Sequence, residues 1–198
     1  MGRKRSLVFG WGINDADYVT ESTVDGKRVS CKFYKTWQSM IQRCYSKKFY
    51  IQRPTYIGCS VCEEWKYFSN FKQWMEQQDW EGKQLDKDLL IKDNKIYSPT
   101  ACVFIDRKLN LFLTDRKKSR GDYPIGVCWD KNANKFMAQC NNGKGKPTYL
   151  GLFTCPNQAH EAWRKCKHEM ACQYADEQTD SRVAEALRNR FSYENWYK

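Results

Sequence analysis

The sequence contains no long hydrophobic run. None of its apolar stretches approaches the roughly 20 residues that a membrane-spanning helix needs. Residues 1–10 are basic and then briefly apolar, and the apolar part is too short for the core of a secretory signal peptide. We therefore expect a protein that neither crosses a membrane nor is secreted, and that works in the cytoplasm.

Histidine is scarce, and several catalytic motifs are missing. The two histidines, His160 and His168, stand at helical spacing among packing residues near the C-terminus. We interpret them as partly exposed helix residues and not as catalytic bases. The sequence has no nucleophile elbow and no glycine-rich phosphate-binding loop of the P-loop type. It therefore gives no support to Ser or Cys hydrolase chemistry.

Cysteine, in contrast, is abundant, with ten residues. Most of them stand in periodic apolar segments, where a free cysteine behaves as a small hydrophobic residue. Because disulfides are rare in the cytosol, we expect reduced, packed thiols. A structural zinc ion is the alternative, since Cys59 and Cys62 have the C-x-x-C spacing of a tetrahedral site. Cys31 and Cys44 are the candidates for the remaining two ligands.

Aromatic residues make up 15% of the chain and include eight tryptophans, a composition that excludes a disordered protein. In the N-terminal part, Asp25-Gly26 predicts a two-residue hairpin turn. Two apolar stripes at helical spacing then predict packed helices over 33–45 and 65–75. The stripes consist of Phe33, Trp37, Met40, Ile41, Cys44 and Tyr45, and of Trp65, Phe68, Phe71, Trp74 and Met75.

The pattern changes after residue 83. Residues 84–90 and 95–97 flank Asp93-Asn94, which predicts a second hairpin, and residues 106–112 follow as a helix. Two strands and a helix within so short a segment predict a ββα unit. Residues 114–122 are rich in Lys and Arg and end near a glycine, so we place a linker there.

Positive charge is unevenly distributed. The net charge is +11, and residues 107–167 contain thirteen Lys or Arg against four acidic residues. Such a local excess is suited to a polyanion, whose phosphates would dominate the affinity and make it salt-dependent. Aromatic residues interleave with the basic ones in this region, which favours a sheet that lies against nucleic acid over a merely solvated surface.

The last part of the chain predicts three strands and a long helix. The strands lie within 127–153, the helix begins near Pro156, and a short basic helix follows over 181–190. We therefore predict an α+β fold. Its parts are an N-terminal helical unit with the ββα finger over 1–113, the linker 114–122, a sheet-and-helix domain over 123–176 and a helical tail over 177–198.

Residues 123–170 resemble the APETALA/ethylene-response-factor type of DNA-binding domain. The shared positions are Gly126, Val127, Trp129, Lys135, Phe136, Ala138, Tyr149, Leu150, Gly151, Phe153, Ala159 and Ala162. The resemblance implies that the sheet enters the major groove of double-stranded DNA while the helix packs behind it. The alternation of a strand agrees, because it would turn Phe136, Ala138 and Cys140 to the helix and Lys135, Met137, Gln139 and Asn141 to DNA. Several arginines of the family are absent, since Cys128, Asp130 and Pro147 stand near their positions, so the target sequence does not carry over.

The DNA-binding residues that we predict come from the linker and this sheet. They are Lys117, Lys118, Arg120, Trp129, Lys131, Lys135, Gln139, Asn141, Lys144, Lys146 and Tyr149.

The middle segment resembles the HNH, or ββα-metal, nuclease finger. Residues 85–88, 97–99 and 103–105 and Asn110 follow its layout of strand, strand and helix. The whole chain resembles phage nucleases that couple such a finger to an APETALA-type domain and that act in intron homing or as free-standing endonucleases. It departs from the finger where the general-base histidine would stand, because Asp86 is followed by Lys87, and the central Asn would fall near Thr100 and is missing.

The remaining groups predict a degenerate metal site. Asp86 and Asp88 lie two apart on a strand and therefore on one face, and with Asn110 they could hold Mg²⁺ or another divalent ion. This interpretation makes the protein a metal-dependent DNA endonuclease. The alternative is a catalytically inactive DNA-binding regulator, or an inhibitor of a host enzyme, built on a decayed finger. A third hypothesis is a module in which the aromatic N-terminal unit binds a host protein.

Overall fold

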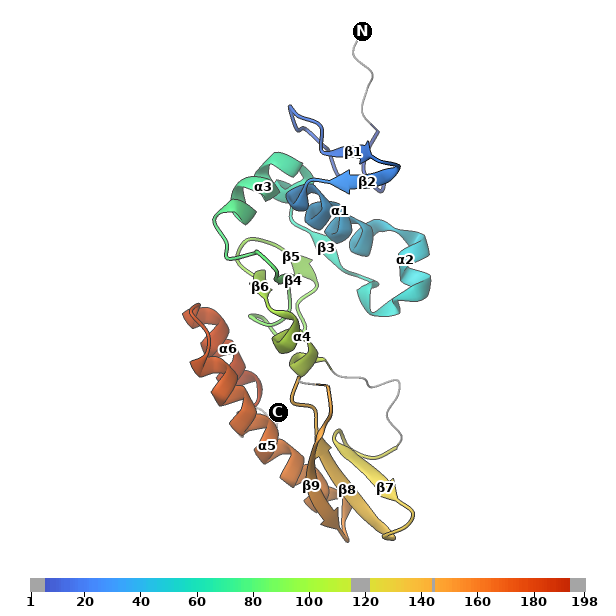
Figure 1. Cartoon of the computed structure of the whole chain (residues 1–198), viewed down its shortest axis with the longest axis vertical. Coiled ribbons are helices and arrows are strands. Elements are labelled where there is room, and N and C mark those ends of the chain that lie inside the picture. The colour runs from blue at the N-terminus through green and yellow to red at the C-terminus, as the bar shows by residue number, and fades with distance from the viewer. Residues whose placement is uncertain (1–5, 115–121, 144, 193–198) are drawn as a thin grey trace. The chain divides into compact units, whose positions relative to one another are not determined.

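The computed structural model describes residues 6–114, 122–143 and 145–192 (Figure 1). It confirms the α+β class: helices are combined with short two-stranded sheets and one three-stranded antiparallel sheet. No helix within the described residues is long and apolar enough to cross a membrane. The chain forms two compact units, Met1–Phe104 and Ile105–Lys198.

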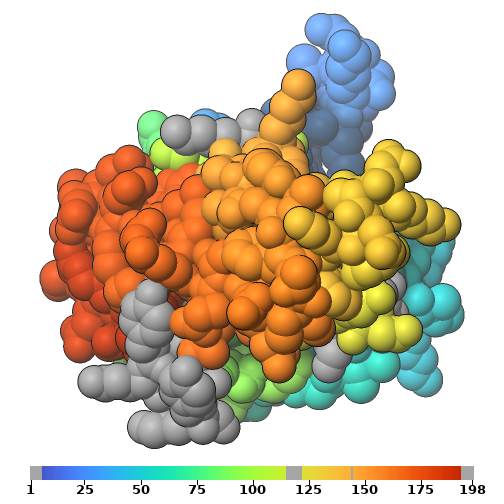
Figure 2. Space-filling model, turned by 90° about the horizontal axis from the view of Figure 1, so that it is seen from below, coloured from blue at the N-terminus to red at the C-terminus, as the bar shows by residue number. Residues whose placement is uncertain are grey.

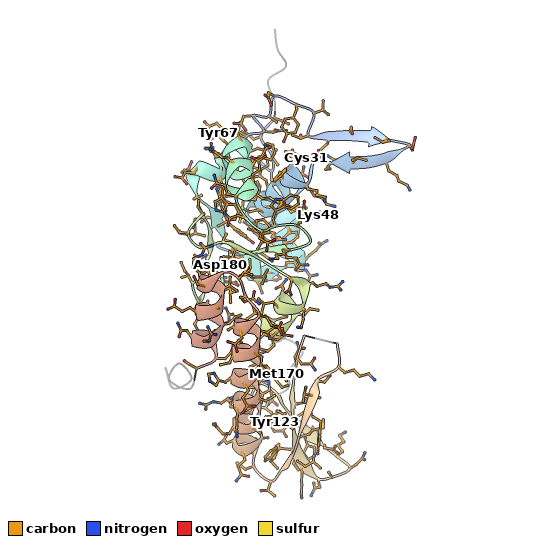
Figure 3. All side chains as sticks on the ribbon, turned by 60° about the vertical axis from the view of Figure 1, so that its left-hand side comes forward. Cys31, Lys48, Tyr67, Tyr123, Met170 and Asp180 are labelled. Carbon is orange, nitrogen blue, oxygen red and sulfur yellow. The ribbon has the colours of Figure 1, made fainter. Side chains whose placement is uncertain are left out.

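The first unit combines helices with short strands. Its elements are β1 (Glu21–Val24), β2 (Lys27–Ser30), α1 (Lys32–Tyr45), α2 (Lys47–Gln52), η1 (Pro54–Tyr56), β3 (Ser60–Val61), η2 (Glu63–Lys66), α3 (Phe68–Glu76), β4 (Gln84–Asp86), β5 (Ile96–Tyr97) and most of β6 (Val103–Ile105). The predicted turn at Asp25-Gly26 is confirmed: both residues have positive φ, at 50° and 71°, and they join β1 to β2 in a projecting hairpin (Figure 3).

The core of the first unit is aromatic, as the two stripes predict. Trp37, Trp65, Phe68 and Phe71 are each at most 1% exposed, and the indole Nε1 of Trp37 donates to the carbonyl oxygen of Trp65 at 2.7 Å. The second predicted helix is present as η2 followed by α3. Most of the aromatic residues that suggested a protein-binding surface are therefore used inside the unit.

The segment between 84 and 97 does not form the predicted hairpin. Instead β4 pairs with β6, and β5 runs parallel to β3. The cause lies in the intervening loop, which is closed by side chains instead of a strand ladder. Asn94 Nδ2 donates to the carbonyl oxygens of Lys87 and Ile96 at 2.6 and 2.7 Å, and Lys87 Nζ donates to that of Asn94 at 2.8 Å.

The second unit begins with α4, the helix of the predicted ββα finger. Its elements are α4 (Arg107–Leu113), β7 (Val127–Asp130), β8 (Lys135–Cys140), β9 (Thr148–Phe153), α5 (Pro156–Asp176) and α6 (Ser181–Arg190). The helix α4 belongs here because its contacts are with this unit: the ring of Phe112 lies 4.7 Å from that of Tyr174, and Asn141 Nδ2 donates to the carbonyl oxygen of Leu111 at 3.0 Å. The division therefore falls before α4, whereas the sequence placed the linker after it.

The sheet β7–β8–β9 packs one face against α5, as predicted (Figure 1). In Figure 2 the yellow and orange segments of the sheet lie beside the orange-red helices. Ala138 and Ala159 are fully buried at this contact, and Trp163 closes it next to Gly126. A Cβ atom at Gly126 would lie 2.1 Å from Trp163 Cδ1, and the φ of Gly126 is +83°, so only glycine fits there. The predicted tail helix is α6, which buries Val183, Ala184 and Leu187.

Candidate nucleic-acid interface and acidic turn

The register of the sheet decides which side chains share its outer face, the face that α5 does not cover. Met137 stands opposite Cys128 on β7 and Leu152 on β9, and Gln139 stands opposite Tyr149. Lys135 and Tyr149 are exposed, Tyr149 by 60%. The predicted alternation along β8 is therefore confirmed, with Lys135, Met137 and Gln139 on the outer face and Ala138 buried.

A β-bulge in β9 determines which of its side chains lie on each face of the sheet. Ala138 pairs with Gly151 while Gln139 pairs with Tyr149, so Leu150 is an extra residue on β9. Gly151 adopts φ +125°, a value that glycine tolerates best. The bulge lets Leu150 and Phe153 both pack on the inner core while Tyr149 and Leu152 stay exposed. Without it, Tyr149 would not share a face with Gln139.

The cations around this face lie at the strand ends. Lys131 follows β7 and Lys146 precedes β9, and both are exposed. The other predicted basic contacts, Lys117, Lys118, Arg120 and Lys144, lie outside the described residues.

Two residues predicted to contact DNA make side-chain contacts within the second unit. Trp129 pairs with Phe136, and their rings meet edge to face at 4.8 Å, so Trp129 lies on the side of Phe136 and not on the outer face. Asn141 is exposed, but its side chain holds the chain to α4: besides its bond to Leu111, its Oδ1 accepts the N–H of Gly143 at 3.0 Å. Neither contact was visible in the sequence, because strand pairing and side-chain hydrogen bonds set both. The DNA contacts of these two residues stay predictions.

The predicted metal ligands Asp86 and Asp88 lie in one turn at the end of β4. Asp86 Oδ1 accepts the backbone N–H groups of Asp88 at 3.0 Å and Leu89 at 2.8 Å, which ends the strand. Asp88 Oδ2 accepts from Lys87 Nζ at 3.0 Å. The third predicted ligand, Asn110, is on α4 in the second unit, so the three residues are divided between the two units.

Lys87 is the cation of this turn, and its side chain is nearly buried, with 7% of the residue exposed. Burial lowers the pKa of its ammonium, but the hydrogen bond and charge of Asp88, together with the charges of Cys59 and Asp86, raise the pKa above its ordinary value. The ammonium therefore stays charged beside the carboxylates. One ammonium therefore stands against the two carboxylates of the turn and lowers their attraction for a divalent ion, and the Mg²⁺ site stays a prediction.

Two of the four cysteines proposed for zinc, Cys44 and Cys59, lie close together. Cys44 and Cys59 are both buried, and the proximity of Cys59 adds to the effect of burial on the pKa of Cys44, which rises to about 12. Cys31 Sγ lies 3.6 Å from the hydroxyl of Tyr18, and Cys62 is only partly buried. In the part of the chain that is described, no group of three or more His, Cys, Asp or Glu side chains is placed to hold a metal ion. Zinc binding stays a prediction.

Sequence reasoning missed the two residues that organise the acidic turn, Lys87 and Asn94. An asparagine beside an aspartate in a loop signalled a turn, but nothing in the sequence indicated that its side chain would bridge two backbone carbonyls. Comparison of the chain with protein-family models, with curated proteins and with solved structures finds no match.

Proposed function

We propose that this protein binds double-stranded DNA through the outer face of the sheet β7–β8–β9. The observation that carries the proposal is the common face shared by Lys135, Gln139 and Tyr149, which α5 leaves open. These side chains suit the parts of a duplex: an ammonium pairs with phosphate, a side-chain amide reads a base edge in the major groove, and an exposed aromatic ring packs on the backbone. The major groove also admits a two-stranded β-ribbon, such as two neighbouring strands of this sheet.

The test compares two substitutions on neighbouring outward positions of β8. Lys135→Ala should weaken binding to every duplex by a similar factor. It should also make the slope of log K against log salt shallower by about 0.9, the value for one phosphate contact. Gln139→Ala should instead change the preference among sequences, by about 1–3 kcal/mol at the base that it contacts. Binding-site selection from a random library, followed by affinity measurements, gives both quantities. If the two substitutions have equal effects on all sequences, the proposal that this face of the sheet contacts DNA is wrong.

For the acidic turn, we propose a structural role, which makes the non-catalytic DNA-binding regulator the better-supported function. Asp86 is used to end β4, and the ammonium of Lys87 balances Asp88. The metal-dependent endonuclease remains the second candidate because two carboxylates, whose oxygens are ligands of Mg²⁺, lie in one turn.

A supercoiled-plasmid assay separates the two candidates. The protein is incubated with Mg²⁺ or Mn²⁺ and, in parallel, with EDTA, and the Asp86→Asn variant serves as the control because it keeps a hydrogen-bond acceptor for the turn. Retention of supercoiled DNA in all lanes, with retardation at high protein, is expected for a regulator. Metal-dependent nicking that Asp86→Asn abolishes would establish the nuclease.

A further inference from the structure

The first unit contains a long segment without negative charge. Between Asp25 and Glu63 the sequence has no acidic residue, and it carries eight basic ones. These are Lys27, Arg28, Lys32, Lys35, Arg43, Lys47, Lys48 and Arg53. No carboxylate within this segment can pair with its cations. Its positive potential therefore depends on whether the fold brings carboxylates from elsewhere close to it.

Elsewhere in the unit the fold does so. Five cations of the first unit form ion pairs with carboxylates: Arg28 with Glu21, Lys66 with Glu63, Lys72 with Glu76, Lys83 with Asp79, and Lys87 with Asp88. In contrast, no ion pair joins Lys47, Lys48 or Arg53 to a carboxylate within residues 6–114, 122–143 and 145–192. Positive charge is therefore left unbalanced at one place.

That place is the α2–η1 surface, which we define as Lys47, Lys48, Arg53 and Lys95. All four residues are exposed, and α2 lies at the outer edge of the first unit (Figure 1); Lys48 is labelled in Figure 3. Lys95 joins the other three although it is distant in sequence, because its Nζ donates to the carbonyl oxygen of Thr55 in η1 at 3.2 Å.

A fifth cation, Arg43, contacts η1, which is part of this surface. The guanidinium of Arg43 lies 5.9 Å from the centre of the Tyr56 ring and donates from Nη1 to the hydroxyl of Tyr97 at 3.5 Å. Both recorded partners are phenols, which orient the guanidinium without neutralising it. Arg43 therefore adds to the positive potential of the α2–η1 surface.

We propose that the α2–η1 surface is a second binding site for the phosphate backbone of double-stranded DNA. The proposal extends the proposed function, since the sheet of the second unit would read the duplex while this surface adds backbone contacts. Exposed cations without an ion-pair partner, spread over a helix and a neighbouring turn, suit backbone phosphates and carry no sequence preference.

A membrane surface is the less suitable partner. Two exposed isoleucines, Ile51 and Ile57, flank the cations, but α2 has six residues. An interfacial helix needs a longer amphipathic face with Trp, Phe or Leu to anchor it. The cations, and not the apolar side chains, are the dominant feature of this surface.

The test uses the full chain and a fluorescent random-sequence duplex. Affinity is measured by anisotropy between about 50 and 200 mM salt for the triple variant Lys47→Ala, Lys48→Ala, Arg53→Ala. If all three side chains pair with phosphates, the negative slope of log K against log salt should become shallower by about 2.7. The affinity at the lower salt should drop at least about tenfold. The matched control, Lys66→Ala, Lys72→Ala, Lys83→Ala, removes the same charge from ion-paired positions and should leave the slope unchanged.

Each outcome has one meaning. A reduced slope for the triple variant alone supports the site, whereas equal reductions in both variants, or none, overturn it. Loss of binding to phosphatidylserine vesicles with unchanged DNA binding would also overturn it. If circular dichroism shows a misfolded triple variant, the single change Lys48→Gln replaces it, with an expected slope change of about 0.9.

Lys135→Ala, measured in the same assay, separates the two proposals. If Lys135→Ala weakens DNA binding and the triple variant does not, the proposed function stands and only the α2–η1 site is rejected. The reverse result would move DNA binding to the first unit alone and remove the sheet from the proposed function.

Discussion

Replacement of Asp86 tests whether the acidic turn is structural. In Asp86→Ala the N–H groups of Asp88 and Leu89 lose their acceptor, and Leu89 is 3% exposed, so its N–H cannot regain a full bond to water. A buried donor left without a partner costs about 1–3 kcal/mol, and the more exposed Asp88 N–H costs less. We expect the free energy of unfolding of the first unit to fall by about 2–3 kcal/mol.

Asp86→Asn should behave differently, because the amide carbonyl still accepts both N–H groups. Only the added strength of a charged acceptor is lost, so we expect a cost of about 1 kcal/mol. If Asp86 served mainly as a metal ligand, the two variants would have similar stability, and both would abolish cleavage.

Urea unfolding followed by tryptophan fluorescence measures these costs. Five of the eight tryptophans lie in the first unit, at positions 11, 37, 65, 74 and 80, so its unfolding dominates the signal. Glu81→Ala, at an exposed position before β4, is the control and should change stability by less than about 0.5 kcal/mol. The reasoning is refuted if Asn and Ala cost the same, or if Ala costs no more than the control.

Two further predictions concern the second unit and the thiols. Gly126→Ala should destabilise the second unit by more than about 3 kcal/mol, because the new Cβ meets Trp163 and the φ is positive; Gly145→Ala, also at positive φ but with no atom within 4 Å of the new Cβ, should cost about 1 kcal/mol. A similar loss in both would show that contact with Trp163 is unimportant. Burial raises the pKa values of Cys44, Cys102 and Cys140 to about 12. Because these pKa values lie above those of the unfolded chain, stability is full below about pH 8.5 and should fall as pH rises towards 12, by up to about 1.4 kcal/mol per pH unit for each thiol. Urea midpoints that stay constant from neutral pH to about pH 10.5 would contradict this.

Local patterns predicted most of the fold. The helical stripes, the Asp25-Gly26 turn, the strands of the last sheet and the tail helix each depend on residues close together in sequence, and each is present. The β4–β6 and β3–β5 pairs were not predictable in this way, because strands of two or three residues contain too few side chains to specify a partner. The loop that separates β4 from β5 is closed instead by the side chains of Asn94 and Lys87, which are contacts that the sequence pattern does not show.

The sequence predicted those interface residues whose face follows from alternation along one strand. It did not predict those whose face depends on the register between strands. Alternation placed Lys135 and Gln139 correctly because β8 is a regular central strand. It could not place Trp129, whose face follows from its pairing with Phe136, and it could not foresee the bulge that returns Tyr149 to the outer face. The position of a bulge depends on the inner packing of Leu150 and Phe153, which is a property of the folded core.

Charge counting from sequence shows the same limit. The excess of basic residues over 107–167 suggested that the positive surface lies in the second unit, yet two of those cations are directed inward. Lys167 is 5% exposed, with its Nζ over the ring of Phe112, and Arg164 is 9% exposed and paired with Glu161. A buried cation stabilises packing and contributes little to the field that DNA meets. The exposed cations around the described sheet are Lys131, Lys135 and Lys146, whereas the first unit exposes four on the α2–η1 surface alone. The salt slope reports the number of phosphates that exposed cations neutralise. If both units bind DNA, we expect a slope steeper than the three exposed cations around the sheet would give.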